Sequence, residues 1–300
     1  MIYTLTLNPA LDYIVRLNHL DLGETNYMSE EIIKVGGKGI NASKLLANLG
    51  ESSVVLGYIG GFTGEELRRK IIEDGLQSEL ITVSEGVTRI NVKIKAQSET
   101  EINGQGLSIS PDEVERLYTQ LDRIQDGDYL FLSGSIPNSL GSDFYQKIMI
   151  HLSNRDIKIT VDASGDALKH TLKCKPYLIK PNLRELEGIF DVTIKEDADL
   201  AHYTQLLQQL GAQNIIVSLG ADGAYMRDSL GTEYRFNAPE GMLIDSVGAG
   251  DSMVAGFVYA MKQGFTTEEA FKFSMCCGSA TAFSPDIARS EEIYELYERL

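Results

Sequence analysis

The chain has 300 residues, of which 43% are hydrophobic, and its 43 acidic against 27 basic side chains give a formal charge of −16. That hydrophobic share is enough for a substantial core and argues against a disordered chain. The negative charge repels nucleic acid and anionic membrane at long range, so neither is expected as a partner.

Cysteine use and the distribution of apolar residues favour a cytoplasmic protein. Cys174, Cys276 and Cys277 make an odd count without metal-binding spacing, as expected in a reducing compartment. The first residues, MIYTLTLNPALDYIV, lack a signal-peptide pattern. The longest apolar run, around 253–261, is far shorter than the ~20 residues that a membrane span needs.

Short β-rich segments alternate with segments of helical periodicity along most of the chain. Strands are predicted at IYTLTL, SVVLGYI, YLFLSG, IKITVD, YLIKP and NIIVSLG. Helices are predicted at 40–49, 65–74, 111–124, 200–210, 252–262, 267–283 and, on the surface, 291–300. This order predicts βαβ units around a mostly parallel sheet in a single α/β domain, 1–300.

Two segments interrupt that rhythm. In TRINVKIKAQSETEI, Ile90, Val92 and Ile94 alternate with Asn91, Lys93 and Lys95, which predicts a strand solvated on its polar face. An irregular stretch from 12 to 35 precedes the first helix. We expect both, as about 12–35 and 87–106, to form a small antiparallel layer that serves as a lid.

Two glycine-rich turns precede helices. GGKGIN at 36–41 allows close backbone approach to a ligand, but it lacks the spacing of a Walker A loop, and an ordinary turn into a helix is the alternative. In DSVGAGDSMVAGF at 245–257, the amides of Ala249, Gly250 and Asp251 would open a helix beginning near Ser252 and form an anion cradle. Asp251 could instead cap that helix.

Together with KPNLRELE at 180–187 and IIVSLGADGA at 215–224, these two motifs occur in the order and spacing of the PfkB/ribokinase family of sugar kinases. The chain resembles that family over essentially its whole length. TLNPALD at 6–12, TRINVKIK and ETEING at 99–104 are similar to its 1-phosphofructokinase branch, close to the tagatose-6-phosphate kinases. The resemblance implies a ribokinase-like three-layer α/β/α sandwich with a mostly parallel central sheet and a small β-sheet lid.

The resemblance also implies the catalytic groups. Asp251 maps onto the family's catalytic base, and the turn made by Gly248, Ala249 and Gly250 maps onto the anion hole for the transferred phosphoryl group. Base and amides act on opposite sides of one reaction, so the two kinds of charge do not compete.

The family's nucleotide and metal residues map onto the second half of the chain. Asn182 and Glu185 fit the N-x-x-E pattern that helps hold Mg²⁺ beside ATP, although a helix capping box is also consistent with them. Lys180 could reach phosphate or be a solvated strand end. Small residues of the nucleotide loop and of CCGSATA, which flanks adenine, are otherwise a hairpin turn and helix packing; they are Ser218, Gly220, Asp222, Gly223 and Gly278.

Sugar phosphate is expected in the N-terminal half. Asp12, with Gly37 and Asn41 beside it, is the expected acceptor for sugar hydroxyls, as the family implies. The expected cations for the substrate phosphate are Arg89, Lys93 and Lys38, with Arg89 able to bind it bidentately. Ser133 and Gly134 follow a strand, where ligands are commonly bound. Lys93 and Lys95 could instead form a solubilising face.

The predicted activity is ATP-dependent phosphorylation of fructose 1-phosphate at O6, giving fructose 1,6-bisphosphate. Tagatose 6-phosphate is the alternative acceptor, and a non-catalytic sugar-phosphate sensor is an alternative of another class. An NAD-dependent oxidoreductase is disfavoured because no G-x-G-x-x-G fingerprint is present. The family also implies a homodimer formed through the lid, with Val15, Ile32, Ile90 and Val92 as candidate contacts.

Overall fold

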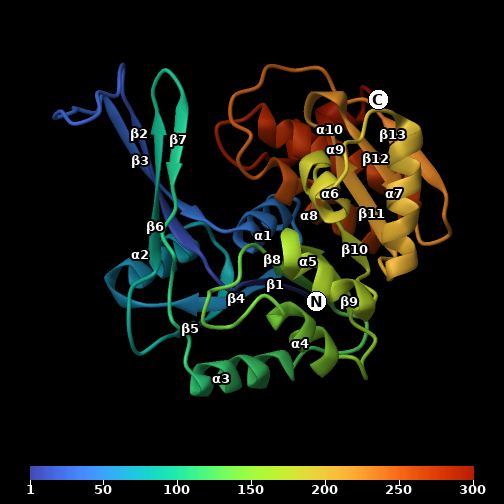
Figure 1. Ribbon diagram of the computed structural model, residues 1–300, viewed down its shortest axis with the longest axis horizontal. Helices are drawn as coiled ribbons and strands as arrows, with labels where there is room; N and C mark the ends of the chain where they lie inside the picture. The colour runs from blue at the N-terminus through green and yellow to red at the C-terminus, as the bar shows by residue number, and fades with distance from the viewer.

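The computed structural model describes residues 1–300. A nine-stranded sheet crosses the molecule (Figure 1). Neighbouring strands are parallel except at β11/β12 and β12/β13. From one edge to the other the order is β13 (Glu233–Phe236), β12 (Ala224–Arg227), β11 (Asn214–Ser218), β10 (Leu178–Ile179), β9 (Lys158–Asp162), β8 (Tyr129–Ser133), β1 (Ile2–Thr6), β4 (Ser53–Ile59) and β5 (Gln77–Thr82).

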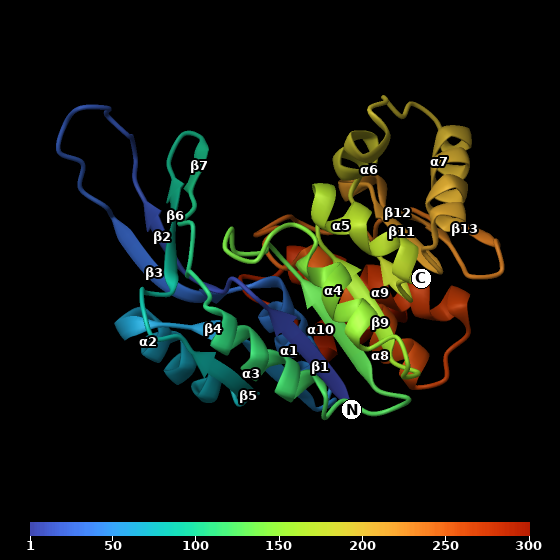
Figure 2. The same ribbon diagram turned by 60° about the horizontal axis from the view of Figure 1, so that its bottom comes forward.

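Helices cover both faces of this sheet (Figures 1 and 2). One face packs on α3 (Pro111–Leu121), α4 (Phe144–His151), α5 (Gly165–Thr171), α6 (Leu183–Phe190) and α7 (Asp197–Leu210). The other face packs on α1 (Lys38–Asn48), α2 (Gly61–Glu73), α8 (Ala249–Lys262), α9 (Thr267–Ala282) and α10 (Ser290–Tyr297). The predicted three-layer sandwich with a mostly parallel sheet is therefore confirmed.

Several sequence predictions of local structure need correction. Helices α2 and α7 begin at Gly61 and Asp197, four and three residues before the predicted starts. Helix α8 begins at Ala249, three residues before the predicted start, because Gly248 adopts a positive φ of 82° and turns the chain into the helix. Helices α4 and α5 and strands β5, β12 and β13 were not predicted. Strands β12 and β13 are only four residues long, and α4 and α5 only eight and seven, too short for a clear periodic pattern.

The second sheet stands away from the large one, at one end of the molecule (Figure 2). Its order is β3 (Glu30–Gly36), β2 (Ala10–Arg16), β6 (Arg89–Lys95) and β7 (Glu99–Ile102). It is not purely antiparallel as expected, because β2 and β6 run parallel. Four chain crossings join this small sheet to the body, which it overhangs.

The two faces of the small sheet differ from the prediction. Register pairs Asp12 with Asn91 and Ile14 with Lys93, so these side chains share the face toward the body. Lys93 is only 7% exposed, whereas Ile90 on the opposite face is 43% exposed. The prediction of a solvated polar face, with Lys93 as a solubilising residue, is therefore wrong. Lys93 can be buried on this face because its ammonium group pairs with the Asp12 carboxylate on the neighbouring strand.

No helix of the chain combines the length and the hydropathy that crossing a membrane would require. The four histidines lie outside the glycine-rich turns at 36–41 and 245–257. For example, His151 pairs with Asp122 on the surface and His19 with Asp21 in the loop of the small sheet.

Candidate active site

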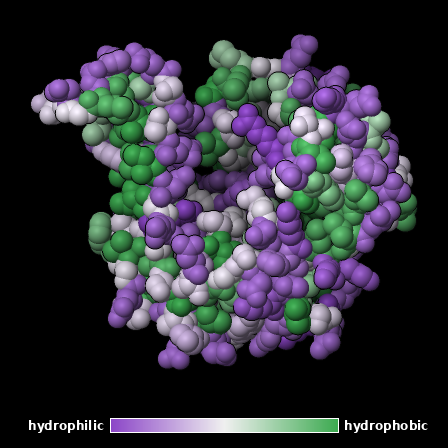
Figure 3. Space-filling model, viewed as in Figure 1, coloured by the Kyte–Doolittle hydropathy of each residue, from purple (hydrophilic) through white to green (hydrophobic).

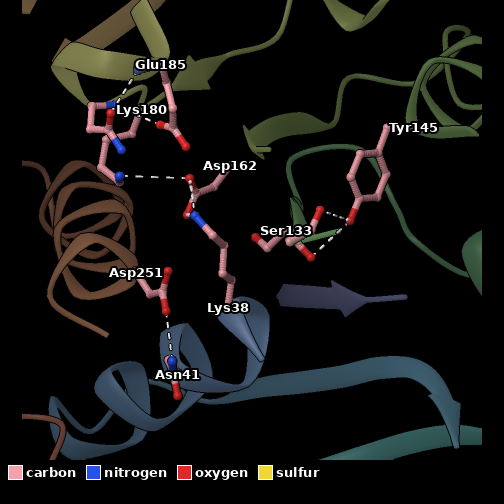
Figure 4. A network of polar contacts seen from close by, with 10 residues as sticks. Lys38, Asn41, Ser133, Tyr145, Asp162, Lys180, Glu185 and Asp251 are labelled. Carbon is pink, nitrogen blue, oxygen red and sulfur yellow. Dashed lines mark hydrogen bonds and ion pairs between the residues drawn. The ribbon is translucent and has the colours of Figure 1, made fainter. Parts of the chain in front are cut away.

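Charged side chains from four elements converge at the carboxyl ends of the central strands (Figure 4). Asp162 ends β9 and lies between two lysines. The Nζ atom of Lys38, in the first turn of α1, is 3.1 Å from each Asp162 carboxylate oxygen. The Nζ atom of Lys180, just after β10, is 3.9 Å from Asp162 Oδ1. Asp251, from α8, faces the same group.

Asp162 was missed by sequence reasoning. Its only signal is its place at the carboxyl end of a parallel strand, where ligands and functional groups gather. Burial alone would raise the pKa of this carboxyl, but the positive charges of Lys38 and Lys180 outweigh burial and hold the pKa below its usual value. Burial would likewise lower the pKa of Lys38, yet Asp162 and Asp251 keep it raised.

Asp251 does not cap its helix. The N-cap of α8 is Gly248, no side chain caps it, and Asp251 lies in the first turn. Its Oδ2 accepts a hydrogen bond of 2.8 Å from Asn41 Nδ2 of α1. The capping alternative is therefore wrong, and Asp251 is held by a side chain from another element.

The acidity of Asp251 is unusual for an aspartate. Burial, followed by the negative charge of nearby Asp162, raises its pKa to about 6. Lys38, Asn41 and Lys180 act in the opposite direction and only partly offset this. A carboxylate with such a pKa is mostly ionised at neutral pH and is a better proton acceptor than an ordinary aspartate.

The turn before Asp251 offers hydrogen-bond donors and a nearby cation. The amides of Gly250 and Asp251 have no backbone acceptor, as expected at a helix N-terminus. A Cβ atom built on Gly250 would lie 3.0 Å from Lys180 Nζ, so the ammonium group lies against these amides. Lys180 is buried, which rules out the solvated strand end considered from the sequence.

Asn182 and Glu185 form the capping box that the sequence allowed. Asn182 is the N-cap of α6, and its Oδ1 accepts the Glu185 amide at 2.9 Å. Glu185 Oε2 accepts the Asn182 amide at 2.8 Å, which leaves Oε1 uncommitted (Figure 4). Capping fixes the Glu185 carboxylate beside Lys180 and Asp162, so the structural role and a ligand role are compatible.

A cavity of about 590 Å³ adjoins the turn. Ala249 and Gly250 form one end of it, and it extends between the loop after β11 and helix α9. Of the residues predicted for the nucleotide, Ser218, Gly220, Gly223 and Gly278 line this cavity, whereas Lys180, Asn182 and Asp222 do not. The β11/β12 pair is also the hairpin that the sequence allowed, and Gly220 and Gly223 of its turn line the cavity.

On the other side of the turn, Asp12 lies buried in β2. Its Oδ1 accepts Asn91 Nδ2 at 2.9 Å and its Oδ2 is 3.1 Å from Lys93 Nζ. Asn91 was not predicted as a site residue, although it lies on the same strand face as Lys93. In this arrangement Lys93 neutralises Asp12, so the ammonium group is already partnered by a carboxylate.

Arg89 is partly committed to the backbone. Its Nε donates to the carbonyl of Asn8 at 3.1 Å and its Nη1 to the carbonyl of Gly104 at 3.3 Å. Burial lowers its pKa. These bonds tie two chain crossings between the small sheet and the body, and they leave Nη2 without a protein partner.

The remaining predicted residues lie at strand and helix ends. Gly37 is the N-cap of α1, and its carbonyl accepts the Asn41 amide at 2.9 Å. Ser133 ends β8, and Tyr145 donates to its carbonyl at 2.9 Å. The amide of Gly134 donates to the Asp162 carbonyl at 3.0 Å and is therefore not free to bind a ligand.

Comparisons with known proteins agree with this geometry. Residues 5–293 match the pfkB family carbohydrate kinase model. The 1-phosphofructokinase of Bacillus subtilis (strain 168) is 42% identical over 296 residues, which cover 99% of this chain and 97% of the relative. The D-tagatose-1-phosphate kinase of Bacillus licheniformis is 33% identical over 285 residues, 95% of this chain and 93% of the relative.

Solved structures show the same relationship. The phosphofructokinase-2 from Escherichia coli in complex with fructose-6-phosphate superposes with a TM-score of 0.92 at 27% identity, covering 100% of this chain and 98% of that one. The resemblance predicted from four short motifs thus extends over the full sequence and the full fold. The chain belongs to the pfkB family of carbohydrate kinases.

Proposed function

We propose that this carbohydrate kinase transfers the γ-phosphoryl group of ATP to O6 of fructose 1-phosphate, giving fructose 1,6-bisphosphate and ADP. The observation that carries the proposal is the buried Asp251 carboxylate, held by Asn41 directly beside the free amides of its own helix N-terminus, where burial also raises its pKa. A proton acceptor and an anion site next to each other match the two needs of phosphoryl transfer to an alcohol. The relatives named 1-phosphofructokinase support this acceptor.

Asp251 takes the role of base. The O6 hydroxyl attacks the γ-phosphorus, the bond from that phosphorus to the β,γ-bridging oxygen breaks, and the hydroxyl proton passes to the Asp251 carboxylate. The Asn41 amide fixes the carboxylate so that one oxygen stays directed at the acceptor. The Gly250 and Asp251 amides, with Lys180 beside them, stabilise the charge on the migrating phosphoryl group.

Mg²⁺ is the cation that we assign to the nucleotide phosphates. No cluster of three histidine, cysteine or acidic side chains is present, so an all-protein cage is excluded. Mg²⁺ normally retains waters and uses one or two carboxylates plus phosphates, and the uncommitted Oε1 of Glu185 fits that chemistry. Glu185 and Asn182 would hold the ion through its water shell, and the bound ion neutralises phosphate charge.

Asp12 and Asn41 are assigned to the sugar hydroxyls and Arg89, Lys38 and Lys93 to its phosphate. Arg89 would use Nη2 for the phosphate while its other nitrogens hold the chain crossings. The Lys93 ammonium group would contact both Asp12 and the sugar phosphate. ATP would occupy the 590 Å³ cavity, with Ser218, Gly220, Gly223 and Gly278 in its wall.

Acceptor preference tests this function. We expect turnover with fructose 1-phosphate to exceed that with tagatose 1-phosphate, tagatose 6-phosphate and fructose 6-phosphate, measured as ADP release at matched concentrations. The relative named D-tagatose-1-phosphate kinase makes tagatose 1-phosphate the second candidate. Faster turnover of either tagatose phosphate would overturn the assignment. No turnover with any sugar phosphate would favour a sensor, which has no use for a base with a raised pKa.

We also propose a homodimer formed through the outer face of the small sheet. Ile33, Ile90 and Ile102 lie on that face and are 45%, 43% and 59% exposed. Val15 and Val92 share this face, whereas Ile32 lies on the inner one, next to Ile14. We expect Ile90→Lys to shift the sedimentation of the protein toward the monomer while an exposed apolar residue elsewhere, Ile72→Lys, leaves it unchanged. A monomeric wild type would reject the dimer.

Two proposals concern the chain as a whole. We treat 1–300 as one kinase domain in which about 12–35 and 87–106 supply a lid. A cytoplasmic location is proposed because Cys174, Cys276 and Cys277 are all free thiols. Secretion of the chain into an oxidising compartment, detected by fractionation, would contradict this location.

A further inference from the structure

Two lysines on the small sheet contact the body on either side of the turn at 248–251. Lys95, at the end of β6, places Nζ 3.6 Å from Asp245 Oδ2. Lys34, on β3, donates from Nζ to the carbonyl of Pro285 at 2.5 Å. Register places both side chains on the inner face of the small sheet. Figure 3 shows hydrophilic residues gathered in the hollow between the two parts of the molecule.

Asp245 supports the turn from its upstream side. Its Oδ1 accepts the amide of Val247, the residue before Gly248, at 3.2 Å. Its own amide donates to the carbonyl of Ala282, at the end of α9, at 3.2 Å. One carboxylate oxygen therefore orders the approach to the turn while the other contacts the small sheet through Lys95.

The Pro285 loop supports the same turn from the other side. Ile287, two residues further on, is buried against Gly248, where a Cβ atom would lie 2.5 Å from Ile287 Cδ1. The side chain of Asn48 donates to the carbonyls of Ile287 and Ala288 at 3.3 and 2.9 Å, which fixes this loop on α1. The Lys34 contact to Pro285 can therefore affect the position of Gly248, because Ile287, which packs against Gly248, is only two residues away.

The space between these contacts is narrow. The cavity lined by Lys34, Lys95, Asp245 and Pro285 measures about 30 Å³, room for only a few water molecules. The Lys95 and Asp245 side chains are 22% and 17% exposed. Water therefore screens these contacts less than it screens a pair on an open surface.

We propose that Lys95 and Lys34 are positioning residues that make the geometry of the 248–251 turn depend on the position of the small sheet. They contact no reacting atom and act through Asp245 and the 284–287 loop. Settling of the sheet over the sugar then orders the amides that receive the phosphoryl group. This inference rests on the proposed function, because the 248–251 turn that it concerns is the proposed anion site.

Kinetics test the coupling once fructose 1-phosphate turnover by the wild type has been measured. We expect Lys95→Met and Asp245→Asn each to lower kcat about fivefold, and the double variant to be no worse than either single one. Lys95→Arg should retain most of the activity. The matched control is Lys147→Met, which removes an exposed pair of 2.9 Å with Asp143 on α4 and should leave kcat unchanged. Fully additive losses, or no loss in Lys95→Met, would overturn the proposal.

A second readout does not depend on the acceptor. Hydrogen exchange of the 243–248 segment should be faster in full-length Lys95→Met, and exchange of 284–288 faster in Lys34→Met, than in the wild type or in Lys147→Met. This result would support the coupling even if another sugar phosphate proved to be the substrate. Unchanged exchange in both segments would overturn it, whatever the substrate.

Discussion

Asp251→Asn should slow phosphoryl transfer strongly while leaving the protein folded and more stable. We expect kcat to fall about 10³-fold, the contribution typical of a general base. The asparagine retains the shape of the side chain. Its oxygen can still accept the hydrogen bond from Asn41 Nδ2, which is 2.8 Å long in the wild type. Folding raises the pKa of Asp251 to about 6, so at pH 7 its charge disfavours the folded state. Removing it should increase the free energy of unfolding by about 1 to 3 kcal/mol.

The pH dependence of these effects follows from the same pKa. In the wild type, kcat/KM should rise about tenfold per pH unit below pH 6 and level off above it, because only the ionised carboxylate accepts the proton. The stability advantage of Asp251→Asn should be full above pH 6, shrink as pH falls below 6, and vanish only below the ordinary aspartate pKa of 3.8, where Asp251 is protonated in both the folded and the unfolded state.

A matched variant separates these effects from a general loss of acid. Asp112→Asn removes an exposed acid that, like Asp251, lies in the first turn of its helix. It should change neither kcat nor the pH profile, and it should not stabilise the protein. Retained turnover in Asp251→Asn, or an unfolding midpoint below that of the wild type, would contradict the role of Asp251.

The sequence predicted the fold well where patterns are local. The apolar strands β1, β4, β8, β9 and β11 and the longer helices carry clear periodicity, so βαβ units around one sheet could be inferred. The N-terminus of α8 was placed three residues late because a glycine with positive φ, not a capping side chain, starts that helix. Short elements such as α5 carry too few residues for a period to show.

The site was predicted where a motif marks it and missed where contacts are long-range. Asp251 and Asn41 lie in recognisable turns, and their hydrogen bond joins segments 210 positions apart. Asp162 is a single aspartate after a strand, and only the folded chain shows it between Lys38 and Lys180. Lys93 was read as either solvated or ligand-binding, because alternation gives the face of a strand but not what covers it.

Asp162→Ala should damage both stability and turnover. Asp162 is buried between Lys38 and Lys180, and removing it leaves two ammonium groups without their carboxylate. Breaking a buried pair in this way typically costs about 3 kcal/mol of unfolding free energy. The lowered pKa of Asp162 means that the wild type has this stability at neutral pH and loses it as pH falls through that pKa. Chemical denaturation at pH 7 measures the loss.

The same variant should change the acidity of Asp251, which separates a role in the site from a role in folding. The negative charge of Asp162 raises the pKa of Asp251, and Lys38 and Lys180 lower it. Without Asp162, the effect that raises the pKa of Asp251 is lost, whereas the two lysines that lower it remain. The pKa of Asp251 should therefore fall, and the acid limb of kcat/KM should shift below pH 6. The double variant Lys38→Met with Asp162→Leu should be more stable than Asp162→Ala, because an apolar pair replaces a buried ion pair. It should not regain turnover, because the Lys38 ammonium group assigned to the sugar phosphate is missing. A wild-type unfolding midpoint together with an unshifted acid limb in Asp162→Ala would show that Asp162 does not organise these charges.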